Sequence, residues 1–390
     1  MRITNLRLED LPGGRRAAAQ VIWEQAKRPA ETLSFDVGGP WADRLQLRPE
    51  AFVLACLPSA FWCGERRLRI DAALCPRLGQ GLRQLTQLWA AQYSRSADLL
   101  IEPQDGWQVP DRAAREFTAA FFSGGVDALS TLLSNRLDYP LTHAGAIGVC
   151  LFLYGTNAMQ MGPDGPDPER FNFYRFHQKR LQVLAESENF DLLPIITNVR
   201  RFSPSYASWA GAGYVPATLA AAHLFTGSIT RVLFAANGIK INEDSEVVAV
   251  HLCSSAGLDA WIDQPGVSRM QKLELLGRWP AWLDLIQPCH LVTIPGGGSL
   301  NCGHCEKCVR TKLALLSLGL AIRPCMFDDP QLQPLRLLRC PMVSHAKISL
   351  FQGLVRPLWR ADLRGIALLL WLRILVARLR LLVSPARWWG

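Results

Sequence analysis

Residues 117–133 read Phe-Thr-Ala-Ala-Phe-Phe-Ser-Gly-Gly-Val-Asp-Ala-Leu-Ser-Thr-Leu-Leu. The run 117–122 is apolar and aromatic, which favours a buried strand, and the run 128–133 consists mostly of good helix formers. Between them, two consecutive glycines allow the backbone to turn sharply and to approach a ligand closely. The stretch therefore predicts a strand, a tight loop and a helix, with free N–H groups at the helix start that attract phosphate oxygens.

The same pattern continues along the central part of the chain. Strand-like apolar runs at 146–154, 192–197 and 231–235 alternate with helical stretches at 128–136, 169–188 and 215–225. Such alternation is typical of a parallel sheet with helices on both faces. Ligands bind beyond the carboxyl ends of the strands in these sheets. We therefore expect an α/β fold in which the loops after Phe122, Tyr154 and Ala235 face a site.

The chain of 390 residues is longer than one ordinary domain, so its length predicts two globular units and possibly an appendage. Residues 1–112 indicate a smaller N-terminal α+β domain, with strand-like runs at 32–37 and 51–57 and a helix at 75–93. Turn formers at 101–110 indicate a linker. The α/β pattern then occupies residues 113–330. Residues 331–390 form a basic, apolar helical tail.

Polar residues in the loop after the first central strand are candidates for phosphate chemistry. Ser123 adds a hydroxyl donor, and Asp127 can orient the loop or hold Mg²⁺ beside the phosphates. Lys240, in the loop 237–244 after a later strand, can neutralise phosphate charge, although a solvated turn is favoured there. Ser-Gly-Gly is also compatible with a plain turn. The sequence contains no Gly-x-x-x-x-Gly-Lys-Ser/Thr loop and no dinucleotide fingerprint at this turn.

The loop resembles the SGGxDS/T loop of the PP-loop, or N-type ATP pyrophosphatase, superfamily. This resemblance implies a HUP-type fold and cleavage of ATP between the α- and β-phosphates, with Ser123 and Asp127 in catalytic roles and ATP and Mg²⁺ as cofactors. The sequence departs from the pattern at Ala128, where the superfamily has Ser or Thr, although Ser130 and Thr131 follow closely. The ATP-binding residues implied are Ser123, Gly124, Gly125, Val126 and Asp127.

Three cysteines near the end of the central part are spaced for a metal. Cys302, Cys305 and Cys308 lie at two-residue gaps, the spacing that wraps a loop around tetrahedral zinc. Three unliganded thiols and an iron–sulfur cluster are the alternatives, and the iron–sulfur cluster is disfavoured because residue 312 is Lys. Four protein ligands would close the coordination shell, which predicts a structural zinc. Cys289 is the favoured fourth ligand, ahead of His304, His290 and Cys325.

Residues 301–311, Asn-Cys-Gly-His-Cys-Glu-Lys-Cys-Val-Arg-Thr, resemble the CGxCxxCxxR zinc motif of the 7-cyano-7-deazaguanine synthase family. In that family a further upstream cysteine completes the site. The resemblance covers about residues 115–325 and is closer to larger QueC-like proteins with an extra N-terminal domain. It implies a ligase that adenylates a carboxylate or a carbonyl group, releases pyrophosphate and forms a C–N bond with ammonia or an amine. It does not identify the carboxylate, which is a small molecule or carried on a protein.

Two other functions remain compatible with these motifs: a tRNA-modifying PP-loop enzyme, and a non-catalytic, zinc-stabilised interaction protein with a degenerate loop. The formal charge is +9, of which +6 lies in residues 351–390, so the main body offers little basic surface and nucleic acid is not expected as a partner. Hydrolase and catalytic-zinc motifs are absent. His143 and His223 are interpreted as structural.

The two ends of the sequence bear on location. Residues 1–10 are charged and contain no apolar run, so we expect a cytoplasmic protein. The helix predicted from Gly365 to about Val383 approaches the length of a membrane span. Arg373, Arg378 and Arg380 interrupt it, and each would cost about 2.5–3.5 kcal/mol near a bilayer centre. We expect this helix to dock on the body, on a protein partner or on a second copy, with peripheral contact with an anionic membrane as the alternative.

Overall fold

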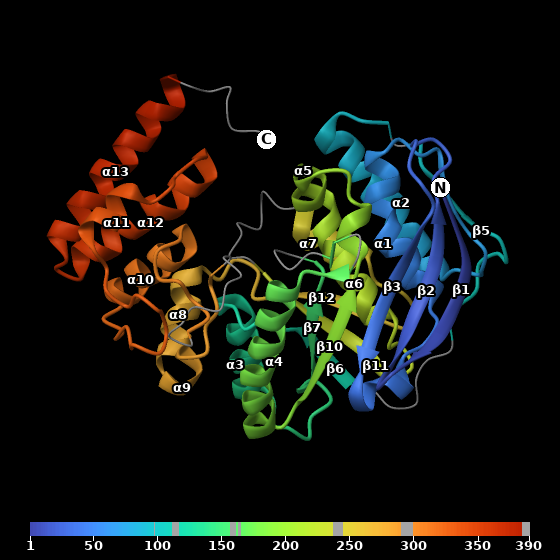
Figure 1. The fold of residues 1–390 in the computed structure, drawn as a ribbon, viewed down its shortest axis with the longest axis horizontal. Helices are drawn as coiled ribbons and strands as arrows, with labels where there is room; N and C mark the ends of the chain where they lie inside the picture. Colours follow the sequence, from blue (N-terminus) through green and yellow to red (C-terminus); the bar gives the residue numbers. More distant parts are fainter. Residues whose placement is uncertain are drawn as a thin grey trace. The chain divides into compact units, whose positions relative to one another are not determined.

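The computed structural model describes residues 1–96, 98–110, 117–156, 161–162, 165–236, 245–289 and 299–383 (Figure 1). The chain divides into two compact units. The first comprises Met1–Ser123 and Thr131–Val267, and the second comprises Gly124–Ser130 and Ser268–Gly390.

In the described part of the chain, the strands lie in the first unit. They are β1 (Arg2–Leu11), β2 (Gly14–Ile22), β3 (Glu31–Gly38), β4 (Arg67–Ile70), β5 (Leu100–Pro103), β6 (Phe117–Phe121), β7 (Ile147–Tyr154), β8 (Met161–Gly162), β9 (Gly165–Pro166), β10 (Asp191–Thr197), β11 (Ile229–Ala235) and β12 (Asp259–Asp263). Its helices include α1 (Pro49–Trp62), α2 (Pro76–Tyr93), α4 (Pro168–Glu188), α5 (Tyr206–Ser208), α6 (Tyr214–His223) and α7 (Ser245–Leu252).

The second unit is helical in its described residues. Helix α3 (Val126–Asp138) begins in this unit and continues in the first. The other helices are α8 (Arg269–Gly277), α9 (Pro280–Leu283), α10 (Glu306–Ser317), α11 (Pro334–Arg339), α12 (His345–Arg360) and α13 (Arg364–Val383).

One large sheet organises the first unit, in the order β12-β11-β6-β7-β10-β3-β2-β1-β4-β5 within the described residues. Strands β12, β11, β6, β7 and β10 are parallel to one another. The connections from β6 to β7 and from β7 to β10 run in one direction along the sheet. The connections from β10 to β11 and from β11 to β12 run in the opposite direction. Right-handed crossovers therefore put α3 and α4 on one face and α6 and α7 on the opposite face. The expected α/β fold is confirmed as far as the class of the fold is concerned.

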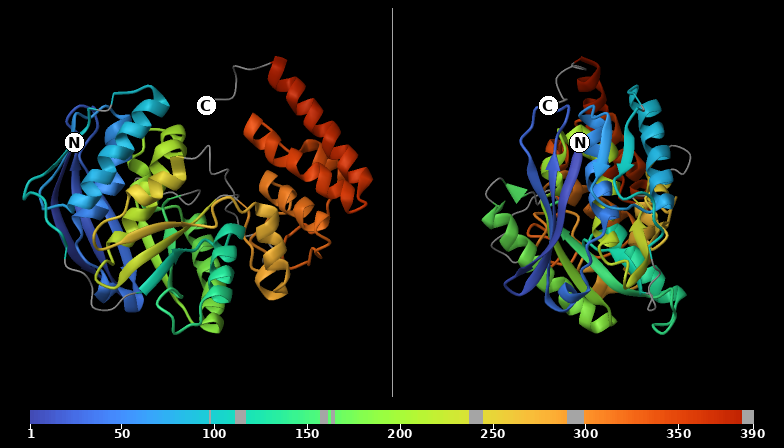
Figure 2. Two further views of the ribbon diagram at one scale, coloured as in Figure 1. Left: turned by 180° about the vertical axis from the view of Figure 1, so that it is seen from behind. Right: turned by 90° about the vertical axis from the view of Figure 1, so that its right-hand side faces the viewer.

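The N-terminal strands extend this sheet. Strand β3 pairs antiparallel with β10 at Val37 and Ile195, and β2, β1, β4 and β5 follow outward. Helices α1 and α2 pack against α6 and α7, so they cover the same face (Figure 2). The compact units thus have other boundaries than the domains 1–112, 113–330 and 331–390 expected from the sequence. The physical reason is that β3 pairs with the open edge of β10 through backbone hydrogen bonds. Such hydrogen bonds cannot be predicted from the composition of the side chains.

The central strands predicted from the apolar runs are all present, and so are the helices between them. Two N-terminal predictions are wrong. The strand-like run 51–57 lies inside α1, a helix that is buried from Glu50 to Phe61 and begins with Pro49 in its first turn. A helix that is apolar on all sides shows no 3.6-residue period, so its apolar run resembles a buried strand. The linker expected at 101–110 includes most of β5, which pairs with β4.

In the second unit, α12 packs against α10 and α13, and α11 packs against α13. Helix α13 spans Arg364–Val383, as predicted. None of the helices in the described part of the chain has both the length and the apolar character needed to cross a membrane.

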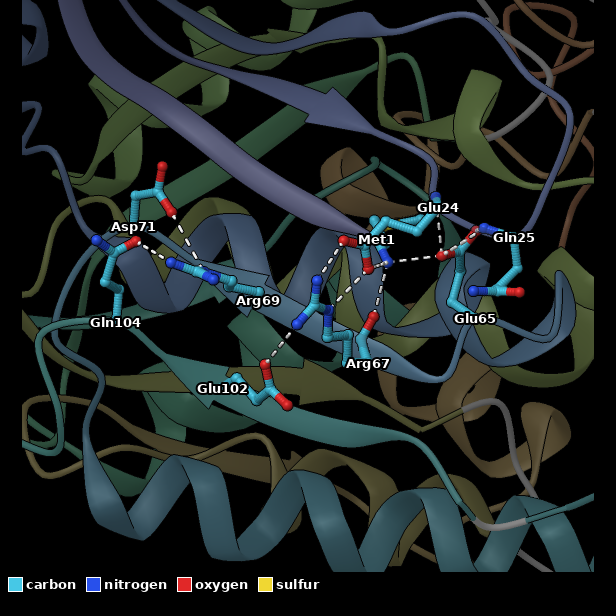
Figure 3. A network of polar contacts seen from close by, with 9 residues as sticks. All are labelled: Met1, Glu24, Gln25, Glu65, Arg67, Arg69, Asp71, Glu102 and Gln104. Carbon is cyan, nitrogen blue, oxygen red and sulfur yellow. Dashed lines mark hydrogen bonds and ion pairs between the residues drawn. The ribbon is translucent and has the colours of Figure 1, made fainter.

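A polar network ties the outer strands of the first unit together (Figure 3). The Met1 amino group donates to Glu65 Oε2 at 2.6 Å, to the Arg67 carbonyl at 2.8 Å and to Glu24 Oε2 at 3.1 Å. Glu65 also accepts from the backbone N–H groups of residues 24–26. Burial alone would raise the pKa of Glu65, but these hydrogen bonds lower it below its usual value. The ionised carboxylate therefore holds β1, the end of β2 and the start of β4 in place.

Replacement of this carboxylate should be costly. We expect Glu65→Gln to lower the free energy of unfolding by about 2–4 kcal/mol, because the buried ammonium loses the nearer of its two carboxylate partners and the backbone N–H groups lose one acceptor oxygen. Urea unfolding followed by circular dichroism measures the change. Glu102→Gln is the matched control, since Glu102 is partly exposed and lies 3.5 Å from Arg67. The control should change stability by about 0.5 kcal/mol or less, and an equal loss in both variants would contradict the role of Glu65.

Candidate functional site

The glycine loop follows β6 at the carboxyl end of the parallel strands. Gly124 has φ +69°, a left-handed conformation that side chains other than glycine rarely adopt. The chain then enters α3 at Val126, with Asp127 in its first turn. The Gly124 carbonyl accepts from the N–H of Gln287 at 2.8 Å, which anchors the loop within the second unit. The local structure is the predicted strand, turn and helix, and Ser123 is exposed at its start.

A buried histidine supports the loop from the first unit. His177 Nε2 lies 2.9 Å from the Ser123 carbonyl, which can only accept, so Nε2 carries the proton. Burial lowers the pKa of His177 to about 4, against the opposing effect of this hydrogen bond. Among the described residues Nδ1 has no hydrogen-bond partner. The ring is therefore neutral at neutral pH and fixes the backbone at Ser123.

Asp127 accepts hydrogen bonds from two cationic side chains of α8. Arg269 Nη2 donates to Asp127 Oδ2, and Lys272 Nζ donates to Oδ1 at 3.2 Å. Lys272 is fully buried, and the Asp127 side chain is 13% exposed. A capping box at Ser268 and Gln271 fixes the start of α8, which sets the direction of both cations. Arg269 and Lys272 are not predictable as site residues from the sequence, because the capping box predicts a helix but not the side chains that this helix faces.

Helix α10 adds further charge around Asp127. Arg310 Nη1 forms an ion pair with Glu306 Oε1 at 3.1 Å, and among the described residues Arg310 Nε has no hydrogen-bond partner. Burial lowers the pKa of Arg310, the nearby Arg269 charge lowers it further, and Glu306 and Asp127 oppose both effects. Lys307 lies in the same group, since desolvation and the charges of Arg269 and Arg310 lower its pKa. Because Lys307 is exposed to solvent, three cations, Arg269, Lys272 and Arg310, lie against the carboxylates of Asp127 and Glu306, which leaves one positive charge in excess.

The missing hydroxyl of the loop is not replaced by Thr131. Ala128 is buried, so this position offers only a methyl group. Thr131 Oγ1 donates to Asp263 Oδ2 at 2.6 Å, at the end of β12 in the first unit. Ser130 is fully buried. The two hydroxyls after the loop thus lie inside the protein.

Four buried cysteines form a compact cluster in the second unit. Cys289, Cys302, Cys305 and Cys308 have Sγ atoms within 4.8 Å of one another. The separations are 3.6 Å for 289–302, 3.7 Å for 289–305 and 3.9 Å for 302–308. A tetrahedral ion with Zn–S distances of about 2.3 Å holds its sulfurs about 3.8 Å apart. The cluster can therefore hold one metal ion such as zinc.

Local backbone geometry brings the thiols together. Gly303 has φ +76°, and a Cβ there would lie 2.2 Å from the Asp329 carbonyl, so only glycine fits the turn. The Cys305 N–H donates to Cys302 Sγ at 3.3 Å, and α10 begins directly afterwards with Cys308 in its first turn. A hydrogen bond from the Cys289 thiol lowers the pKa of Cys302 to about 6. One thiolate is therefore available near neutral pH as a first metal ligand.

Asn301 organises the surroundings of the cluster. Its side-chain Oδ1 accepts from the Cys289 N–H at 3.2 Å. Its Nδ2 donates to the carbonyls of Ile286 and Met326 at 2.7 and 2.8 Å. This buried amide joins three segments that are distant in sequence. The role of Asn301 cannot be predicted from the motif in which it stands, because its three partners lie outside that motif.

Two of the other ligand candidates, His304 and Cys325, are not part of the cluster within the described residues. His304 is exposed, with Nδ1 3.0 Å from the Cys302 carbonyl, and Cys325 is exposed. His290 and Lys240 lie outside the described residues. Lys312, the position that argued against an iron–sulfur cluster, is buried and donates to the carbonyls of Asp329 and Gln331. Its role there is to support the segment after the cluster.

The histidines interpreted as structural differ in their surroundings. His223 is fully buried with Nε2 2.9 Å from the Cys253 carbonyl, and burial lowers its pKa to about 4. His143 is exposed and stacks on Tyr139.

Comparison with known protein families, curated proteins and solved structures finds no match for this chain.

The neutral His177 predicts acid sensitivity. Its pKa in the folded protein, about 4, lies below the ordinary value of 6.5, so the unfolded chain binds more protons between these pH values. The free energy of unfolding should fall as pH decreases from 6.5 to 4, by up to about 1.4 kcal/mol per pH unit for each such histidine. His177→Gln keeps an N–H donor. It should make the free energy of unfolding less dependent on pH, because only the contribution of His223 remains. Urea titrations at several pH values measure the slope.

Gln182→Asn is the control on the same helix, since Gln182 is exposed. In this variant the free energy of unfolding should depend on pH as it does in the original protein. A slope unchanged in His177→Gln would show that His177 is charged in the folded state.

Proposed function

We propose that this protein is an ATP-dependent ligase of the PP-loop type, which adenylates a carboxylate and transfers the acyl group to ammonia or an amine. The observation that carries the proposal is the Ser123–Asp127 loop at the start of α3, with two cations of α8 on Asp127. A loop of this shape offers backbone N–H groups at a helix start, where phosphate oxygens are stabilised.

The charge around the loop supports binding of a polyphosphate. Arg269 is 30% exposed, so its guanidinium can contact a ligand while Asp127 keeps it in place. Lys272 is fully buried beneath it and adds fixed positive charge. Preorganised cations of this kind stabilise negative charge that develops on a leaving pyrophosphate. Asp127 is in this view a positioning residue for Arg269 and Lys272.

The proposed reaction has two steps. In the first, a carboxylate oxygen of the substrate bonds to the α-phosphorus of ATP, the bond from this phosphorus to the β-phosphate oxygen breaks, and pyrophosphate leaves with the electron pair. In the second, the nitrogen of ammonia or an amine attacks the acyl carbon, a C–N bond forms, and the C–O bond to AMP breaks. The nitrogen loses a proton, and an amide and AMP are the products.

Magnesium has no assigned ligand in this proposal. Both carboxylate oxygens of Asp127 accept from cationic side chains, which does not fit a direct metal contact at this residue. The expected role of Mg²⁺ beside the phosphates stays a prediction.

We also propose that the four-cysteine cluster holds a structural zinc. The donor set supports this assignment, because four thiols match the preferred ligands of zinc and their separations suit one tetrahedral ion. Cys289, Cys302, Cys305 and Cys308 would fill all four positions, so the ion would supply stability to the start of α10 and no open site for substrate.

One observation favours a non-catalytic alternative. Ala128 lacks the hydroxyl of the PP-loop pattern, and Thr131 is hydrogen-bonded to Asp263. A loop with one phosphate contact fewer suits a zinc-stabilised interaction protein. Release of pyrophosphate separates the two functions.

Direct ATP binding provides a test that needs no acyl substrate. Titration calorimetry with ATP should show Arg269→Ala weakening the affinity about ten-fold or more, equivalent to about 1.4 kcal/mol. Arg278→Ala is the matched control, because Arg278 is an exposed arginine at the far end of the same helix. The control should bind ATP as the original protein does. Equal affinities for Arg269→Ala and the original protein would contradict the role of α8.

Turnover identifies the reaction class. Incubation with ATP, ammonium and a panel of carboxylic acids should yield AMP and pyrophosphate with one of the acids, and Asp127→Asn should abolish both products. Formation of ADP and phosphate instead would rule out the proposed chemistry.

Metal content tests the cysteine cluster. Elemental analysis of untagged protein should find about one zinc per chain. Cys289→Ser should lose the metal and lower the free energy of unfolding by about 3 kcal/mol or more, because metal binding and folding are coupled. Cys325→Ser is the control, since Cys325 is exposed and outside the cluster. Retention of full zinc content in Cys289→Ser would exclude it as a ligand.

A further inference from the structure

Helix α13 buries only one of its sides. Ala367, Leu370, Ile374 and Ala377 are at most 4% exposed, on the side where α13 packs against α11 and α12. Arg373 lies on this side too and donates to the Cys340 carbonyl at 2.6 Å. One side of the helix is therefore fully accounted for by packing within the second unit.

The opposite side is apolar and open to solvent. Six large aliphatic side chains on it are 41–75% exposed. At 3.6 residues per turn they span about 120° of the helix surface along most of its length. Contiguous apolar surface of this kind marks a site where something else binds. We call it the α13 apolar face, formed by Leu368, Leu372, Leu375, Val376, Leu379 and Leu382.

Arginines border this face on both sides. In a helical projection at 3.6 residues per turn, Arg364 lies at one edge of the apolar face. Arg378 lies about 40° beyond that edge, and Arg380 lies about 40° beyond the opposite edge. All three are exposed, and Arg378 reaches Gln352 of α12 at 2.7 Å. Trp371, 51% exposed, lies between the apolar face and Arg378. Apolar side chains flanked by arginine and tryptophan are typical of a helix lying in the headgroup region of a bilayer.

The charge distribution identifies what the face meets. Residues 331–390 contain ten basic side chains and one acidic side chain, Asp362, so they carry the entire formal net charge of +9. A second copy of the chain would bring two such positive segments together, which repulsion opposes. A nucleic acid would match the charge but leave the apolar face uncovered. An anionic lipid surface satisfies both features.

We propose that the α13 apolar face binds the surface of an anionic bilayer. The apolar side chains enter the boundary between headgroups and acyl chains, and Arg364, Arg378 and Arg380 extend to the anionic headgroups. The helix lies flat, because its other side stays packed on α11 and α12. This inference is independent of the proposed ATP chemistry.

Vesicle co-sedimentation of the full-length protein tests the proposal. Vesicles of phosphatidylcholine with 30 mol% phosphatidylglycerol should pellet the protein, and pure phosphatidylcholine should not. Raising the salt concentration should weaken binding. Arg378→Gln with Arg380→Gln should reduce binding to the anionic vesicles about five-fold for each arginine, the equivalent of about 1 kcal/mol each.

Leu372→Gln with Leu375→Gln tests the apolar component and should abolish pelleting. Val183→Gln is the matched control, because Val183 is an exposed apolar residue of α4 in the first unit. Circular dichroism and zinc content verify that each variant is folded. Binding that survives the double leucine change overturns the proposal. So does a soluble dimer of the original protein that the leucine variant loses, or retention of the original protein by an acidic protein but not by anionic vesicles.

Discussion

The carboxylate of Asp127 is largely buried, and two cationic side chains of the second unit are paired with it. Charges that leave water are tolerated when they are paired and hydrogen-bonded. Asp127 is supplied with two cations by α8, one of them fully buried. The same need explains why α8 begins with a capping box, since a helix with a fixed start presents Arg269 and Lys272 in one direction.

A similar constraint governs the cysteine cluster. Four thiols in contact cannot all ionise without a cation, and the hydrogen bonds among them already favour the thiolate of Cys302. An ion in the cluster would join the Cys289 segment to the start of α10. Arg310 follows Cys308 by two residues and contributes to the charge near Asp127. A bound ion would thus add rigidity near Arg310, in addition to the hydrogen bonds that the buried Asn301 already makes beside the cluster.

Helix α13 shows the opposite situation, because its apolar surface exceeds what the protein covers. A helix that is apolar on most sides is usually buried. Here α11 and α12 cover one side, and the arginines occupy the borders of the other. The tail therefore has the composition of an interior helix and the charge of a surface one, a combination that suits the boundary between water and lipid.

Local information was sufficient for the central strands and helices, the glycine loop and the three clustered cysteines, because each depends on neighbours within a few residues. The period of the apolar residues predicts a helix or a strand, and cysteines at two-residue gaps predict a metal-binding loop. Features that depend on distant residues escaped prediction. The apolar run in α1 lacks a period because it is buried on all sides, and β3 joins β10 through backbone groups common to every sequence. Arg269, Lys272 and Asn301 acquire their roles only from partners that tertiary folding brings to them, and hydrogen bonds over such sequence separations leave no periodic or spacing signal.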